Sequence, residues 1–86
     1  MEDIKSYKRK FNHTLEPFKV MLVNLQDSLT HEEWIRFVER TRTSVIDQPD
    51  QYLGSDLPDR ETLQLIVKII FDEFLEERLY ATKSVI

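Results

Sequence analysis

Residues 63–80, LQLIVKIIFDEFLEERLY, hold the densest apolar run of the chain and decide its fold. At helical spacing, most of the apolar residues predict one wide stripe that faces a core: Leu63, Ile66, Val67, Ile70, Phe74 and, with drift, Leu75 and Leu79. Leu65, Ile69 and Phe71 fall off that stripe, on a second flank. A helix that is apolar most of the way round needs cover on more than one side, from the rest of the chain or from a second copy.

A strand over residues 65–71, LIVKIIF, is the alternative, because this segment is rich in β-branched residues. Its flanks are helical in composition, and no second strand is evident for it to pair with. We therefore expect a central helix over about 57–82. Its N-cap is predicted at Ser55 or Asp56, with Pro58 in the first turn.

The whole chain has the composition of one small helical domain. Its 86 residues are 41% hydrophobic, too apolar for simple disorder, and include only one glycine and three prolines. These values predict a single all-α domain over residues 1–86, a bundle of about four helices with a small core. The absence of cysteine excludes a thiol nucleophile and favours a reducing compartment, so we expect a cytoplasmic location.

A heptad-like apolar stripe opens the chain, and Pro17 interrupts it. Its members recur at steps of three and four: Ile4, Tyr7, Phe11, Leu15, Phe18, Leu22, Leu25 and Leu29. A proline inside a helix removes a backbone hydrogen bond and clashes with the preceding turn. The pattern predicts either two helices or one helix kinked at Pro17, with the break near residues 13–16 and Thr14 as a candidate cap.

The clearest local signal is a helix start at Thr30. Glu33 follows three residues later and completes a capping box, and Leu29 and Trp34 are placed for a hydrophobic staple. We expect this helix to end near residue 45 or 46. The residues predicted to form the core of the domain are Trp34, Phe37, Val38, Ile66, Ile70 and Phe74.

Residues 47–57, DQPDQYLGSDL, have the composition of a linker. Pro49 stops the preceding helix, and Gly54 permits a backbone turn. Tyr52 and Leu53 are apolar for a linker, so we expect them to lie against the core.

Charge is distributed unevenly along the chain. The net charge is −4, but residues 1–45 carry eight basic against seven acidic residues, and residues 46–86 carry four against nine. This asymmetry favours contact between the two halves, within one chain or across a dimer. The acidic balance makes a nucleic-acid partner unlikely, and the longest apolar run is too short and too charged for membrane insertion.

Two groups of basic residues stand out against the acidic total. Lys5, Lys8 and Arg9 form an edge on the first helix, and Arg36 and Arg40 lie on the third. They are either ordinary solvated residues or a site for nucleic acid or lipid. If the second and third helices formed a helix-turn-helix, the arginines would lie on its recognition helix.

Acidic residues form the other group with candidate chemistry. Asp72, Glu73, Glu76 and Glu77 read as a solvated surface or an acidic docking surface. At residues 31–33, HEE, a helix start explains the sequence better than a metal site does, because adjacent helical residues point apart. No phosphate-binding loop, catalytic triad spacing or paired histidines appear, so we predict no cofactor, no metal, no catalytic residue and no small-molecule substrate.

These observations favour a non-enzymatic protein–protein interaction module, a small cytoplasmic regulator or adaptor. It would act as a homodimer or on a different protein partner, through the second flank of the last helix. The predicted interface residues are Leu65, Lys68, Ile69, Asp72 and Glu76. The alternative is a small DNA-binding regulator of the helix-turn-helix type.

Overall fold

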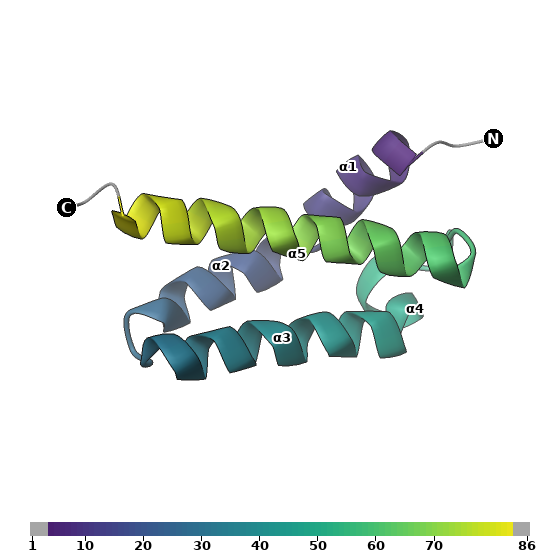
Figure 1. Cartoon of the computed structure of the whole chain (residues 1–86). Helices are drawn as coiled ribbons and strands as arrows, with labels where there is room; N and C mark the ends of the chain where they lie inside the picture. The colour runs from purple at the N-terminus through teal and green to yellow at the C-terminus, as the bar shows by residue number, and fades with distance from the viewer. Residues whose placement is uncertain (1–3, 84–86) are drawn as a thin grey trace.

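The computed structural model describes the backbone of residues 4–83 and the side chains of residues 4–79. Within these residues the chain forms five helices: α1 (Ile4–Thr14), α2 (Glu16–Gln26), α3 (His31–Asp47), α4 (Pro49–Leu53) and α5 (Arg60–Lys83). α3 and α5 run in opposite directions, and α1 passes behind α5 (Figure 1). The all-α fold is confirmed. The strand alternative for residues 65–71 is wrong, because the whole segment lies in α5.

The break between α1 and α2 falls at Leu15, inside the predicted window. Leu15 keeps helical backbone angles, and its N–H still donates to the Phe11 carbonyl at 2.8 Å, so the two helices bend rather than separate. Pro17 lies at the start of α2, where its missing N–H is tolerated. Thr14 is not the cap that we predicted, because its hydroxyl donates to the Lys10 carbonyl inside α1.

The capping box that starts α3 is confirmed. The Thr30 hydroxyl accepts from the Glu33 N–H at 3.2 Å, and the Glu33 carboxylate accepts from the Thr30 N–H at 3.0 Å. Thr30 itself has extended backbone angles, as an N-cap residue requires. Two backbone donors that the first turn would otherwise leave unpaired are thereby satisfied.

The linker contains one short helix, α4, which we did not predict. Pro49 begins it, and Gly54 ends it with a φ of 92°, a conformation that glycine adopts without strain. Tyr52 and Leu53 lie against the core as predicted. Leu53 is buried, and the ring of Tyr52 lies 5.2 Å from that of Phe18.

The cap of α5 is Asp59, so the prediction of Ser55 or Asp56 is wrong. The Asp59 carboxylate accepts from the Thr62 N–H at 3.3 Å and from the Thr62 hydroxyl at 2.7 Å. Pro58 precedes the helix instead of lying in its first turn. A proline disfavours helical angles in the residue before it, so the helix begins only beyond Pro58, and Asp59 is the first acceptor there.

A single core joins all five helices around α5. Its buried members are Phe11, Leu15, Leu22, Trp34, Val38, Val45, Leu53, Leu63, Ile66, Val67, Ile70, Phe71 and Phe74. Two placements differ from the sequence analysis. Phe71 belongs to this core and not to the second flank, and Phe37 is 36% exposed on the outer side of α3.

The two halves of the chain make the electrostatic contacts that their charges favour. Lys8 on α1 lies 2.6 Å from the Glu73 carboxylate on α5, and Lys10 lies 2.9 Å from Asp56. Both pairs join a base in the first half to an acid in the second half of the same chain. Because they are partly exposed to solvent, they orient α1 more than they stabilise it.

Replacing the cap should destabilise the domain measurably. We expect Thr30→Ala to lower the free energy of unfolding by about 1 kcal/mol, because the acceptor for the Glu33 N–H is lost. Thermal and urea melts followed by circular dichroism measure the change. Thr43→Ala is the control, because that exposed hydroxyl lies mid-helix and bonds only the Glu39 carbonyl. Equal losses in the two variants would show that capping is not the cause.

Stability should also depend on pH through Glu33. Hydrogen bonds from the Thr30 backbone and then from its side chain lower the pKa of Glu33 below its ordinary value of 4.5. A pKa lowered by folding contributes stability above the ordinary value, and this is lost as pH falls through the folded-state pKa. Glu33→Gln keeps an acceptor but cannot titrate. The parent should therefore have the higher Tm near neutral pH, and its advantage over the variant should shrink as the pH falls. An advantage that grows on acidification would contradict the link between the pKa of Glu33 and stability.

The aromatic contact at the centre of the core should be costly to remove. Phe74 is 7% exposed, and its ring lies 6.0 Å from that of Trp34. We expect Phe74→Ala to lower the free energy of unfolding by about 3–5 kcal/mol, a large part of the stability of a small domain. Phe37→Ala removes the same ring from a site that is 36% exposed and should cost clearly less. Chemical denaturation of both variants tests the assignment.

Candidate functional site

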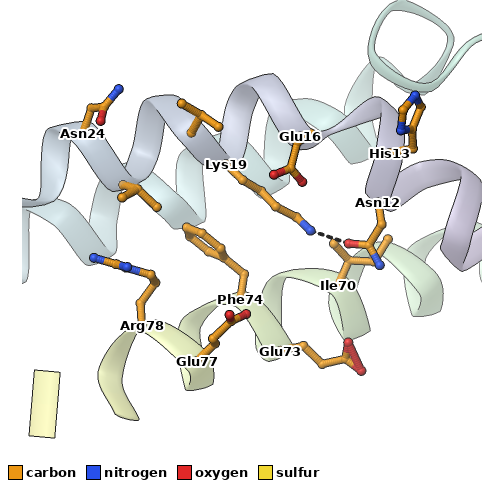
Figure 2. A pocket seen from close by; sticks show the side chains of 12 residues that line it. Asn12, His13, Glu16, Lys19, Asn24, Ile70, Glu73, Phe74, Glu77 and Arg78 are labelled. Atoms are coloured by element: carbon orange, nitrogen blue, oxygen red, sulfur yellow. Dashed lines mark hydrogen bonds between the residues drawn. The ribbon is translucent and has the colours of Figure 1, made fainter. Parts of the chain in front are cut away.

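An open groove separates α2 from α5. α2 packs on α1 and α3 but not closely on α5, so the two helices diverge and leave a hollow of about 610 Å³ between them. Figure 2 shows side chains of α2 and α5 converging on this space from opposite sides. We call this hollow the α2–α5 groove, and its lining is Asn12, His13, Glu16, Lys19, Val20, Val23, Asn24, Ile70, Glu73, Phe74, Glu77 and Arg78.

Apolar side chains from both helices line the groove between its charged edges. Val20 and Val23 come from α2, and Ile70 and Phe74 come from α5. Ile70 and Phe74 are core residues, so that part of the lining continues into the hydrophobic core. The other eight of the twelve lining residues are polar or charged, so the apolar part is a narrow strip with polar side chains on both sides.

The cations beside the groove are held by amides of the same chain. The Lys19 ammonium donates to the Asn12 side-chain oxygen (Figure 2). Arg78 donates through Nε to the Gln26 side chain at 2.9 Å, a bond that links α5 to the end of α2. Neither cation is therefore a fully mobile surface charge.

The carboxylates of the groove are less engaged. Glu73 pairs with Lys8, but Glu16 and Glu77 form no ion pair or hydrogen bond within the described part of the chain. Both are exposed, and Figure 2 shows them reaching into the groove from opposite walls. The two carboxylates therefore remain available to cations of a partner, whereas Lys19 and Arg78 keep their charge but are already hydrogen-bonded to neutral amides.

The apolar surface continues from the groove onto the exposed side of α2. Val20 is 50% exposed and Met21 is 40% exposed. Neither residue was predicted from the sequence to belong to a contact surface. The composition of α2 did indicate one, because the helix carries apolar residues on every side and buries only Leu22 completely. A surface helix normally shows one apolar side, so the excess indicated a second contact surface.

The predicted interface residues lie together on a different side of α5. Leu65, Lys68, Asp72 and Glu76 are exposed, and Ile69 is half-buried. Their spacing of three and four residues places them on one side of the helix. None of them lines the α2–α5 groove. We call these five residues the outward face of α5.

The basic residues do not form one surface. Lys5, Lys8 and Arg9 lie on α1, whereas Arg36 and Arg40 lie on α3, a helix that does not pack closely on α1. Lys8 is engaged by Glu73 on α5. A smaller hollow of about 210 Å³ lies where α3 exposes Phe37 between Arg36 and Arg40.

The acidic cluster of α5 is divided between two surfaces. Glu73 and Glu77 line the groove, while Asp72 and Glu76 belong to the outward face. At the start of α3, Glu33 is occupied by the capping box. Within the described residues, no three side chains of metal-binding type come together.

Comparison with protein families, with curated proteins and with solved structures finds no match for this chain. None of the helices in the described residues combines the length and the apolar character needed to cross a lipid bilayer.

Proposed function

We propose that this chain is a non-enzymatic protein-interaction module that binds a helical segment of a protein partner in the α2–α5 groove. The observation that carries the proposal is the narrow apolar strip along this groove, formed on α2 by Val23 and the exposed Val20, together with the exposed Met21 beside it. A groove between two helices with an apolar strip along it is suited to the apolar side of a third helix. Filling it would remove from water a surface that a solitary domain leaves exposed.

The charges beside the groove favour a basic partner. Glu16 and Glu77 flank the apolar lining, while Lys19 and Arg78 are each held by an amide of this chain. Opposite charges at the edge of an interface steer association and select the partner's orientation. The partner segment is therefore an amphipathic helix with short aliphatic side chains on one side and lysine or arginine beside them.

A binding role suits the groove better than catalysis does. Among the described residues its lining contains no serine, threonine, cysteine or tyrosine, and the histidine there, His13, is exposed at the edge. The pairings that activate a nucleophile need such residues beside a base. The proposed role is that of a small regulator or adaptor, and the absence of cysteine supports a cytoplasmic location.

Self-association is a separate part of the proposal. The outward face of α5 carries Leu65, which is 47% exposed, and the half-buried Ile69. A domain of 86 residues has a small core, and pairing two copies would add apolar burial. This surface is distinct from the groove, so the same chain could form a homodimer and bind a different protein.

DNA binding is the second candidate, and the arrangement of α2 and α3 gives it less support. Figure 1 shows α3 folding back along α2, whereas the helices of a helix-turn-helix cross steeply. Glu32 and Glu33 occupy the first turn of α3, where a recognition helix contacts bases. Arg36, 4.0 Å from the Glu32 carboxylate, forms at most a loose pair with it.

A charge placed in the groove should abolish partner binding without unfolding the domain. We expect Val20→Glu to weaken binding at least tenfold, because the apolar side chains of the partner would cover a carboxylate in place of the half-exposed valine and strip it of water. Leu65→Glu is the matched control, since it makes the same kind of change on the outward face of α5. The probe is a synthetic amphipathic helix with leucines on one side and lysines beside them, followed by titration calorimetry and by amide chemical shifts.

The shifts should concentrate on α2 and α5 residues of the groove and persist in Leu65→Glu. The same helix with glutamate in place of lysine should bind more weakly. Shifts that map to α1 or the outer side of α3, or a Val20→Glu variant that binds as the parent does, would contradict the proposal. Binding of duplex DNA that falls steeply with salt would favour the second candidate instead.

A further inference from the structure

The outward face of α5 carries charges that the rest of the chain leaves unused. Lys68, Asp72 and Glu76 form no ion pair or hydrogen bond within the described residues, although Glu73 on the same helix pairs with Lys8. All three side chains are exposed. The face is thus an exposed helical surface with both signs of charge and with apolar side chains among them.

The position of Lys68 restricts what can cover this face. It lies one turn from Leu65 and next to Ile69, so a surface that buries those two side chains also surrounds the ammonium. Burying an ammonium is costly unless an opposite charge meets it in good geometry. A partner that covers Leu65 and Ile69 is therefore favoured if it brings a carboxylate to Lys68 and a cation to Asp72.

We propose that the partner is a second copy of this chain, and that α5 pairs with α5 of that copy in antiparallel orientation about a two-fold axis beside residue 70. Residues 68 and 72 lie at equal distances on either side of residue 70. Lys68 then meets Asp72 of the second copy, and the two-fold axis repeats that pair. A parallel pairing would instead place each charge against its own counterpart, which is repulsive.

The same register aligns the apolar residues. Residues 65 and 75 are also equidistant from residue 70, so Leu65 packs on Leu75 of the second copy, a side chain that is half-buried in the monomer. Ile69 approaches its own counterpart close to the axis. One register thus pairs the central charges and buries three apolar side chains of each copy, as the layers of an antiparallel helix pair require.

This inference deepens the self-association part of the proposed function and leaves the groove free. The groove residues Glu73, Phe74 and Glu77 lie on a different side of α5 from the outward face. A dimer in this register can therefore hold one partner helix in each groove.

A charge swap tests the register, because each single variant makes like charges meet twice. We expect Lys68→Asp and Asp72→Lys to be monomers, each losing at least about 100-fold in the association constant. Mixed one to one, they should form a heterodimer, and Lys68→Asp/Asp72→Lys should restore the homodimer. Sedimentation equilibrium at protein concentrations of tens of micromolar and above measures the oligomeric state of each variant and of the mixture. Circular dichroism confirms that every variant is folded.

Lys5→Asp is the control, since it makes the same change of charge at an exposed lysine of α1 and should leave the dimer intact. A parent that stays monomeric would overturn self-association and the register together, and the groove would still be tested separately by Val20→Glu. A dimer that persists in both single variants, or a mixture without heterodimer, would overturn the register alone.

Discussion

The structure depends on the side chain of Trp34, which joins three helices at one point. The indole is fully buried, and its N–H donates to the Leu22 carbonyl of α2 at 2.7 Å, while its ring packs against Phe74 of α5. A buried indole N–H without an acceptor costs free energy, so the bond fixes where α3 lies along α2. Because Trp34 contacts α2 and Phe74 together, it supports the groove residues from within the core. The shape of the groove is therefore a consequence of core packing.

Most of the fold follows from local sequence patterns. The capping box at Thr30, the break before Pro17 and the core stripe of α5 were predictable because each depends on residues a few positions apart. The errors arise where several local signals compete. The segment before α5 offers three capping residues, and only the position of Pro58 relative to the helix selects Asp59. α4 is a single turn, too short for periodicity to indicate it.

The site was less predictable than the fold because it depends on how helices diverge. No spacing along the chain shows that α2 leans away from α5, and the groove exists only because it does. Side-chain exposure has the same origin. Phe37 has the composition of a core residue but lies on the outer side of α3, whereas Phe71 has its place in the core because α5 is covered through a wider arc than its central stripe. The outward face of α5 could be predicted, since helical spacing alone brings its residues together.

α5 presents three different sides, and this division decides how the protein can be probed. One side supplies core residues, a second lines the groove, and the third presents Lys68 and Asp72. Phe74 belongs to the first two at once, so a change there alters stability and binding together. Val20 and Lys68 each belong to one surface only. If a second copy covers the third side, it stabilises α5 by mass action without touching the groove. Dimer formation would then raise the fraction of folded chains, and with it the fraction that has an intact groove. The intrinsic affinity of the groove would stay the same. A small domain of this kind would gain stability from the dimer and keep its specificity in the groove.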